Sequence, residues 1–236
     1  MSTYLLCIPT YNEAENILDL LTRLEAQQIP DLSILVIDDG SPDGTADLVA
    51  GHNGQISILR RTRKEGLGPA YKAGFAWGLE RKFDFFIEMD ADGSHQPEEL
   101  YRLIQTSQSA DLALGTRWMA GGAVENWPAY RRAISRIGTW YAEWALKLPY
   151  KDLTGGFRVL SGELLQKIDY SSIESIGYGF QIEIVMRAHD AGLQITEVPI
   201  TFIERTKGRS KMSKAIVFEA LKKTTSWAIT RRVNRR

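Results

Sequence analysis

The sequence predicts an α/β protein in which a mostly parallel central sheet carries helices on both faces. Short apolar runs recur between turn-forming residues, and most of them do not alternate, as in strands that are buried on both faces. Between these runs lie stretches whose apolar residues repeat with the period of a helix. The 236 residues, 44% of them hydrophobic and 25% charged, suffice for one domain with a substantial core.

The expected elements follow one another in a regular order. The strands are expected at residues 4–9, 34–38, 56–59, 83–89 and 112–115. The helices between them are indicated by Ile17, Leu20, Leu21 and Leu24 at helical spacing, by residues 69–78, and by Leu100, Leu103 and Ile104 after Pro97. No internal repeat or linker interrupts the chain, so residues 1–210 are expected to form one domain and residues 211–236 a C-terminal helix.

Charge and cysteine usage exclude several classes of protein. Cys7 is the single cysteine, which excludes an internal disulfide and favours a reducing cytoplasm. No uncharged stretch exceeds about a dozen residues, whereas a membrane-spanning helix needs about 20 apolar ones, and no basic signal region precedes the first strand. Residues 205–236 hold 11 basic residues and one acid, Glu219, which leaves 18 basic and 28 acidic residues in the body. The tail is therefore expected to meet a polyanionic surface.

Polar clusters follow three of the expected strands. Residues 9–13 come after the first strand, residues 38–44 after the second and residues 90–95 after the fourth. Ligands of open parallel sheets bind outside the carboxyl ends of the strands, so we expect these clusters to converge on one edge.

The most informative cluster is the one in which an apolar strand ends in Asp90 and Asp92. Two carboxylates this close repel each other unless a cation or a proton intervenes. A Mg²⁺ or Mn²⁺ ion that shares its oxygen ligands with a substrate diphosphate is one interpretation. In the other, Asp92 or Ser94 caps the helix that starts near Pro97.

Residues 38–44 have two interpretations as well. Gly, Pro, Ser and Asp are turn formers, and Asp43 could cap the next helix. Together with residues 9–13, the same acids could instead bind a nucleobase or ribose. Residues 60–64 add four basic side chains, but they form no phosphate loop, and no dinucleotide fingerprint follows the first strand. His52, His95 and His189 show neither a catalytic triad nor zinc spacing.

Taken together, the motifs resemble those of inverting glycosyltransferases of family 2. They are residues 9–13 (PTYNE), 38–45 (DDGSPDGT), 90–92 (DAD) and 115–117 (GTR). Residues 121–136, 152–158 (DLTGGFR), 177–181 (GYGFQ) and 205–212 further resemble the dolichol-phosphate (polyprenol-phosphate) mannose synthases. The resemblance spans residues 4–220 and implies a glycosyltransferase A (Rossmann-like) fold.

The resemblance also implies a set of site residues. The nucleoside of GDP-mannose is expected at Pro9, Tyr11, Glu13, Ile37 and Asp39, and the metal and diphosphate at Met89, Asp90, Ala91 and Asp92. Arg117, Arg205 and Lys211 match phosphate-facing positions, and Arg131 with Ser135 matches the acceptor-phosphate contact, so that Asp92, Arg117 and Arg131 are the expected catalytic residues. Ser94 stands where some relatives carry a Gln metal ligand, which leaves Ser94 or water to complete the set.

The expected reaction moves mannose from GDP-mannose to the phosphate of a polyprenyl or dolichyl phosphate. The second pKa of a phosphate monoester is about 6, so its oxygens attack without a general base. The alternatives are transfer of another sugar, such as glucose or amino-arabinose, and a non-catalytic scaffold that binds sugar nucleotides at a membrane. No nucleic acid partner is expected.

The C-terminal helix is predicted to be amphipathic and basic. Its apolar side would carry Ile216, Val217, Ala220, Leu221, Trp227 and Ala228, and its polar side Glu219, Lys222, Lys223 and Ser226. Such a helix lies in the interface of a membrane, here the cytoplasmic face. Packing against the sheet and docking of a small membrane-embedded subunit are the alternatives.

Overall fold

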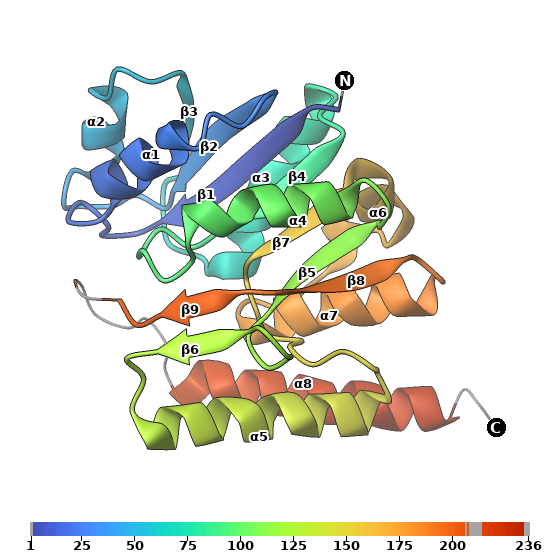
Figure 1. Ribbon diagram of the computed structural model, residues 1–236. Coiled ribbons are helices and arrows are strands. Elements are labelled where there is room, and N and C mark those ends of the chain that lie inside the picture. The colour runs from blue at the N-terminus through green and yellow to red at the C-terminus, as the bar shows by residue number, and fades with distance from the viewer. Residues whose placement is uncertain (1, 206, 208–213, 234–236) are drawn as a thin grey trace.

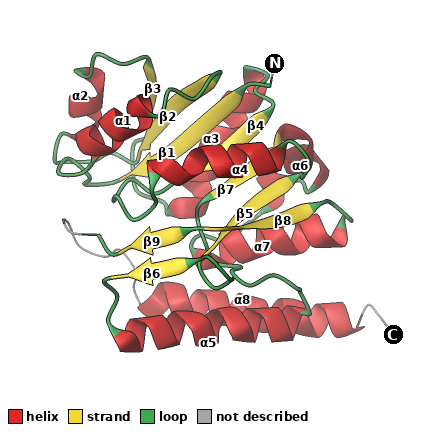
Figure 2. Ribbon diagram, in the orientation of Figure 1, coloured by secondary structure: helices red, strands yellow, loops and turns green. Residues whose placement is uncertain are grey.

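A seven-stranded sheet forms the centre of the computed structural model, which describes residues 2–205, 207 and 214–233. The strand order is β3-β2-β1-β4-β7-β5-β8, and every neighbouring pair is parallel except the two that β7 makes. The strands are β1 (Tyr4–Thr10), β2 (Leu32–Asp38), β3 (Ile56–Arg60), β4 (Phe85–Glu88), β5 (Leu112–Thr116), β7 (Arg158–Ser161) and β8 (Ile195–Pro199). The predicted mostly parallel sheet is confirmed (Figures 1 and 2).

Helices cover both faces of this sheet. The helices are α1 (Ile17–Ala26), α2 (Thr45–Ala50), α3 (Leu67–Glu80), α4 (Leu100–Ser107), α5 (Ala129–Leu146), α6 (Gly162–Lys167), α7 (Tyr178–Asp190) and α8 (Lys214–Val233), with short 3₁₀ turns at Pro97–Glu99 and Tyr170–Ser172. One core cluster joins α1, α2 and α4 to the sheet, and a second joins α3, α6 and α7 to its other face. The apolar runs of the central strands are therefore buried on both sides, as predicted, whereas the run in edge strand β3 is only half-buried.

The predicted strands agree with the observed ones to within a few residues. The largest difference is at β4, which was predicted at residues 83–89 but begins only at Phe85, because residues 83 and 84 belong to the turn that follows α3. The amide of Phe83 donates to the carbonyl of Gly78 at 3.2 Å, and the amide of Asp84 donates to that of Thr3 at 3.2 Å. The apolar run thus begins with helix capping and becomes a strand only at Phe85.

Strand β7 is the element that shapes the site. It inserts antiparallel between β4 and β5, and its first residue, Arg158, pairs with the last residue of β4, Glu88. The preceding loop, residues 152–157, therefore arrives at the carboxyl ends of the parallel strands. A second, two-stranded parallel sheet of β6 (Ala123–Glu125) and β9 (Thr201–Ile203) extends from the same edge.

Helix α8 packs beside α5 and α7 (Figure 1). The Tyr141 hydroxyl lies 2.6 Å from that of Thr225, and Arg231 donates to Asp190 at 2.9 Å. Part of the predicted apolar side packs inward, because Ala220 and Ala228 are buried, whereas Leu221 is exposed. The side chain of Ile216 lies outside the described part of the chain. None of the described helices is both long and apolar enough to cross a bilayer.

Candidate functional site

A cavity of about 280 Å³ opens at the carboxyl edge of the sheet. The loops after strands β1 to β5 line it, together with Thr154, Gly156, residues 176–178, Phe202 and Arg205. Ten of the residues predicted from sequence meet there: Pro9, Tyr11, Glu13, Asp39, Asp90, Ala91, Asp92, Arg117, Arg131 and Arg205. The convergence expected from parallel strand ends is thus present.

The two aspartates after β4 lie at the floor of this cavity. The pKa of Asp90 is raised to about 7, mainly by burial and to a smaller extent by repulsion from Asp92. Oδ1 of Asp92 accepts the backbone N–H of Ser94 at 3.0 Å and the Ser94 hydroxyl, and Oδ2 lies 2.6 Å from the guanidinium of Arg205. The predicted capping of the helix near Pro97 does not occur, since no side chain caps that 3₁₀ turn. Asp92 closes a local turn instead.

Neutral His95 supports the same loop. It is buried, and burial lowers its pKa to about 4. Its Nδ1 accepts the backbone N–H of Asp90 at 3.1 Å, and its ring stacks on Phe157 with centroids 5.1 Å apart. The imidazole is therefore neutral and holds the backbone of the first aspartate in place.

The donor set suits a hard divalent cation that is shared with a substrate. No group of three His, Cys, Asp or Glu side chains poised for a metal occurs among the described residues. Two carboxylates that repel each other at a buried strand end match the way Mg²⁺ is held, with its other ligands taken from phosphates and water. Ser94 is buried against Asp92 and does not line the cavity, so its predicted role as a ligand stays a prediction.

The opposite end of the cavity carries Tyr11, Asp39 and Lys64. Lys64 Nζ lies 4.5 Å from the centre of the Tyr11 ring, and Arg61 donates to Asp39 at 2.5 Å. Asp38, next in sequence, instead accepts the amides of Gly40 and Ser41 at 3.1 and 2.9 Å.

The turn interpretation of residues 38–44 is confirmed for two of the acids, whereas binding of a nucleobase or ribose by Asp39 stays a prediction. Asp38 and Asp43 build the turn, since Asp43 accepts the amides of Ala14 and Thr45 at 3.0 and 3.1 Å. Asp39 faces the cavity. Ile37 and Met89 are fully buried beneath it and do not line it, so they shape its floor from the core.

Arg117, after β5, stands on the far wall. Its Nε and Nη2 donate to the two oxygens of Asp152 at 2.6 and 2.8 Å, and Nη2 also reaches the hydroxyl of Thr154 at 3.1 Å. Burial alone would raise the pKa of Asp152, but Arg117 holds it below its usual value. This buried bidentate pair fixes the orientation of the guanidinium at the cavity wall.

Arg131 stands in the first turns of α5. Its guanidinium is paired with Glu204 and lies 4.3 Å from the centre of the Trp127 ring. A second cavity, of about 340 Å³, runs from this point between α5 and α8. We call this second cavity the groove. Arg131 and Ser135 both line it, as predicted for two residues on one face of a helix, and Gly138 lines it as well.

The groove and the first cavity meet at a shared boundary. Both are lined by Arg117, Trp127, Arg131, Thr154 and Tyr178. Three of these, Trp127, Thr154 and Tyr178, were not predicted individually as site residues, although they belong to sequence motifs at 121–136, 152–158 and 177–181. Lys211 lies outside the described residues.

Comparison with known proteins places this site in a family. The sequence model of glycosyl transferase family 2 matches residues 5–169. Undecaprenyl-phosphate mannosyltransferase from Micrococcus luteus is 48% identical over 228 residues, which cover 95% of this chain and 93% of that protein. Polyprenol monophosphomannose synthase from Mycolicibacterium smegmatis is 45% identical over 236 residues, which cover 98% of this chain and 89% of that protein. The resemblance found in the sequence motifs is confirmed.

Solved structures confirm the predicted fold class. Glucosyl-3-phosphoglycerate synthase from Mycobacterium tuberculosis, solved with Mn²⁺, UDP and glucosyl-3-phosphoglycerate, superposes with a TM-score of 0.73. The match covers 96% of this chain and 80% of that chain at 17% sequence identity, so the likeness concerns the fold. From the family match and the two relatives, the chain belongs to glycosyltransferase family 2.

Proposed function

We propose that this protein transfers mannose from GDP-mannose to the phosphate of a polyprenyl monophosphate and inverts the anomeric centre. The observation that carries the proposal is the junction between a charged cavity and a largely apolar groove, with Arg117 and Arg131 at the boundary. The two relatives whose names include mannosyl transfer to polyprenyl phosphates support the choice of sugar and acceptor.

The charged cavity suits a sugar nucleotide. Tyr11 and Asp39 provide a ring and a carboxylate for the nucleoside, and Asp90 with Asp92 faces the position of a diphosphate. When bound there, a Mg²⁺ or Mn²⁺ ion would offset the charge of the diphosphate that leaves. Arg205, which lines the same space, adds a positive charge on the leaving-group side.

The groove suits an isoprenoid chain. Its lining is mostly apolar and comes from both α5 and α8, with Ile134, Tyr141, Ile182 and Leu221 among its residues. A phosphate at the head of such a chain would reach Arg131 and Ser135 while the chain lies between the helices. Arg117 and Arg131 then hold the phosphate oxygen facing the sugar, a kind of electrostatic contribution worth about 3–4 kcal/mol per well-placed group.

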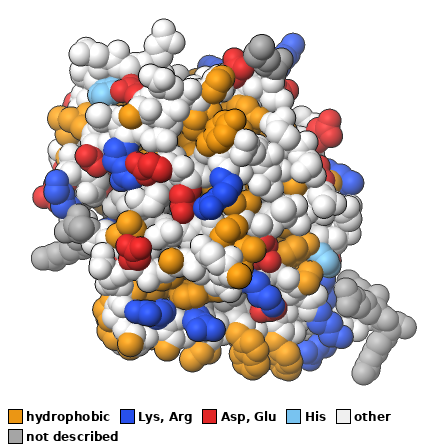
Figure 3. All heavy atoms as spheres, in the orientation of Figure 1, with side chains coloured by type: hydrophobic (Ala, Val, Ile, Leu, Met, Phe, Trp, Pro, Cys, Tyr) orange, Lys and Arg blue, Asp and Glu red, His pale blue; other side chains and the backbone are white. Residues whose placement is uncertain are grey.

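The same acceptor implies contact with a membrane. Large apolar side chains are exposed along the outer faces of two helices: Tyr130, Ile134, Ile137, Trp140 and Trp144 on α5, and Phe218, Leu221, Ile229 and Val233 on α8. Hydrophobic and basic side chains gather on the lower face in Figure 3, where α5 lies. Exposed apolar patches beside basic residues are typical of proteins that bind anionic membranes at the interface.

A transfer assay tests the proposed reaction. The protein is incubated with Mn²⁺, a polyprenyl phosphate and radiolabelled GDP-mannose, UDP-glucose or GDP-glucose, and the lipid product is extracted with organic solvent. We expect label from GDP-mannose alone in the organic phase. Label from another donor would show that its sugar, and not mannose, is the one transferred. No label from any donor would favour the non-catalytic alternative.

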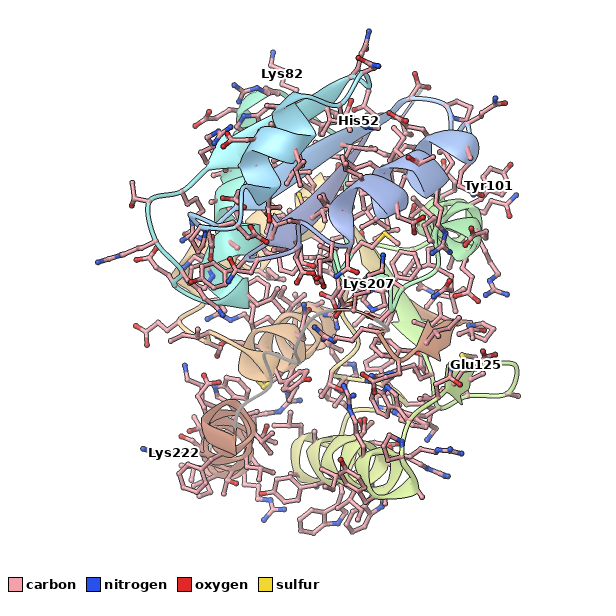
Figure 4. All side chains as sticks on the ribbon, turned by 90° about the vertical axis from the view of Figure 1, so that its left-hand side faces the viewer. His52, Lys82, Tyr101, Glu125, Lys207 and Lys222 are labelled. Carbon is pink, nitrogen blue, oxygen red and sulfur yellow. The ribbon has the colours of Figure 1, made fainter. Side chains whose placement is uncertain are left out.

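Vesicle binding tests the membrane contact. We expect the protein to co-sediment with anionic vesicles at low salt, and Trp140→Glu combined with Trp144→Glu to abolish this binding while the fold is kept, because both rings are exposed. Tyr101→Glu, on α4 and 55% exposed, is the matched control and should bind normally (Figure 4). If the double Trp variant binds vesicles as well as the wild type does, the exposed apolar side chains of α5 contact another partner, such as a membrane-embedded subunit.

A further inference from the structure

Two adjacent residues of opposite charge follow β9 and contact both halves of the site. Arg205 lies 2.6 Å from Oδ2 of Asp92, at the end assigned to the diphosphate and its metal ion. Glu204 pairs with Nη1 of Arg131, at the mouth of the groove. The dipeptide thus joins the donor side to the acceptor side.

The backbone fixes this dipeptide in place. The amide of Ile203 donates to the carbonyl of Ser94 at 3.1 Å, and the amide of Glu204 donates to that of Glu125 at 3.1 Å. Ser94 belongs to the aspartate loop and Glu125 to β6, so the end of β9 is held between them. The two ion pairs follow from this position.

Each pair involves a charge that the proposed substrates would need. Asp92 is assigned to a cation, yet a guanidinium already neutralises one of its oxygens. Arg131 is assigned to a phosphate, yet a carboxylate already neutralises it. The four side chains are between 6% and 22% exposed, and separating the partners of an ion pair in such a place is costly. Each ion pair therefore occupies a charged group that one of the proposed substrates would contact.

We propose that Glu204 and Arg205 are internal competitors of the substrates, which displace them from Arg131 and Asp92; this inference rests on the proposed function. Arg205 competes with the divalent cation for Asp92, and Glu204 competes with the acceptor phosphate for Arg131. A cation alone binds weakly, because it must break the ion pair between Arg205 and Asp92. A cation that arrives with a diphosphate binds well, because the diphosphate is a new partner for the guanidinium. Metal and nucleotide are therefore taken up together.

Binding of Mn²⁺ without nucleotide tests the role of Arg205. Free Mn²⁺ is measured by electron paramagnetic resonance with the wild type, Arg205→Gln and the control Lys207→Gln. Lys207 is exposed and two residues further along, so its variant removes the same charge without the contact to Asp92 (Figure 4). We expect Arg205→Gln to bind Mn²⁺ about tenfold more tightly than the wild type, within the usual range of coupling between sites, and Lys207→Gln to bind as the wild type does.

Repeating the titration with saturating GDP gives the second half of this test. The advantage of Arg205→Gln should disappear, because the wild-type guanidinium then has the diphosphate as its partner. If Arg205→Gln binds Mn²⁺ alone no more tightly than the wild type while circular dichroism shows a native fold, the role given to Arg205 is wrong.

Binding of geranyl phosphate, followed by calorimetry, tests the role of Glu204. Glu204→Gln should bind this short acceptor about fivefold more tightly, again a coupling of ordinary size. Glu125→Gln, which removes an exposed acid one strand away, should match the wild type (Figure 4). Equal or weaker binding by Glu204→Gln would overturn the role of Glu204. If both variants show the expected binding differences but the wild type transfers no mannose, the proposed function is refuted and this inference still stands.

Discussion

A larger side chain at Gly138 would distinguish a role of the groove in lipid binding from a role in folding. Gly138 lies in the middle of α5 and lines the groove, and a Cβ atom built on it meets no heavy atom within 4 Å. The position therefore has open space for the first carbon of a side chain, and in Gly138→Leu the remaining carbons would extend from it beside the groove. Glycine within a helix costs about 0.5–1 kcal/mol relative to a good helix former. The variant should be more stable, with a melting temperature higher by roughly 1–4 °C.

The same side chain should interfere with the acceptor. The groove has a volume of about 340 Å³, and a leucine in it takes the place of part of the isoprenoid chain. Each buried methylene contributes about 0.8 kcal/mol, so exclusion of only two carbons weakens binding by about 1.6 kcal/mol, or roughly fifteenfold. We expect this loss in KM for polyprenyl phosphate, with KM for GDP-mannose unchanged.

Thermal unfolding and transfer kinetics are measured on the same preparations. Gly138→Ala is the matched control, because it gives the helix the same gain and adds only one carbon to the groove. If Gly138→Leu is more stable than the wild type and yet has the wild-type KM for a long-chain acceptor, the lipid chain does not lie between α5 and α8.

The other predictions concern charged residues of the site. Asp92→Ala should abolish mannosyl transfer while circular dichroism stays native, and a folded variant with near-normal transfer would remove Asp92 from the metal site. Arg131→Ala should raise KM for polyprenyl phosphate far more than KM for GDP-mannose, and the reverse pattern would assign Arg131 to the donor. The pKa of Asp152 is lower in the folded protein than its ordinary 3.8, so the stability from its pair with Arg117 is present above pH 3.8 and lost as pH falls through the folded value. Asp152→Asn should therefore cost about 3–5 kcal/mol in denaturant unfolding near neutral pH, and this difference should begin to shrink as the pH falls below 3.8; a difference that stays constant down to acid unfolding would contradict the ion-pair account.

The sequence was sufficient for strands β1 to β5 and for one side of the site, whereas β8, which pairs parallel with β5, was not predicted. Strands β1 to β5 are apolar runs with turn residues at their ends, and this local pattern needs no tertiary information. Because parallel strands end at one edge, the convergence of Tyr11, Asp39 and Asp90 could be predicted without knowing the strand order. What separates Asp38 from Asp39 is the direction of a side chain in a turn, which the sequence pattern does not show.

The remaining parts depend on contacts between distant segments. Strand β7 has four residues and starts with Arg158, a residue type that indicates a surface, yet Arg158 is fully buried beside Glu88 with 3.6 Å between Nε and Oε2. β6 and β9 have three residues each, too few for a periodic pattern. The pairing of Arg117 with Asp152 is likewise visible only once β7 has brought its loop to the sheet edge. These strands and this ion pair depend on contacts between distant segments, which a local sequence pattern does not show.

The insertion of β7 also sets the order in which the chain can fold as it leaves the ribosome. Strands β3, β2, β1 and β4 form a continuous half-sheet that is complete in sequence by Glu88. Strand β5 pairs only with β7 and β8, so it has no partner in the main sheet until Arg158–Ser161 has been made. During that interval the edge of β4 is open, and an open strand edge is a template for pairing with another chain. The part of the cavity around Tyr11, Asp39 and Asp90 can therefore assemble early, whereas the wall with Arg117 waits for a strand made about 70 residues later, and the open edge is exposed to pairing with other chains during that interval.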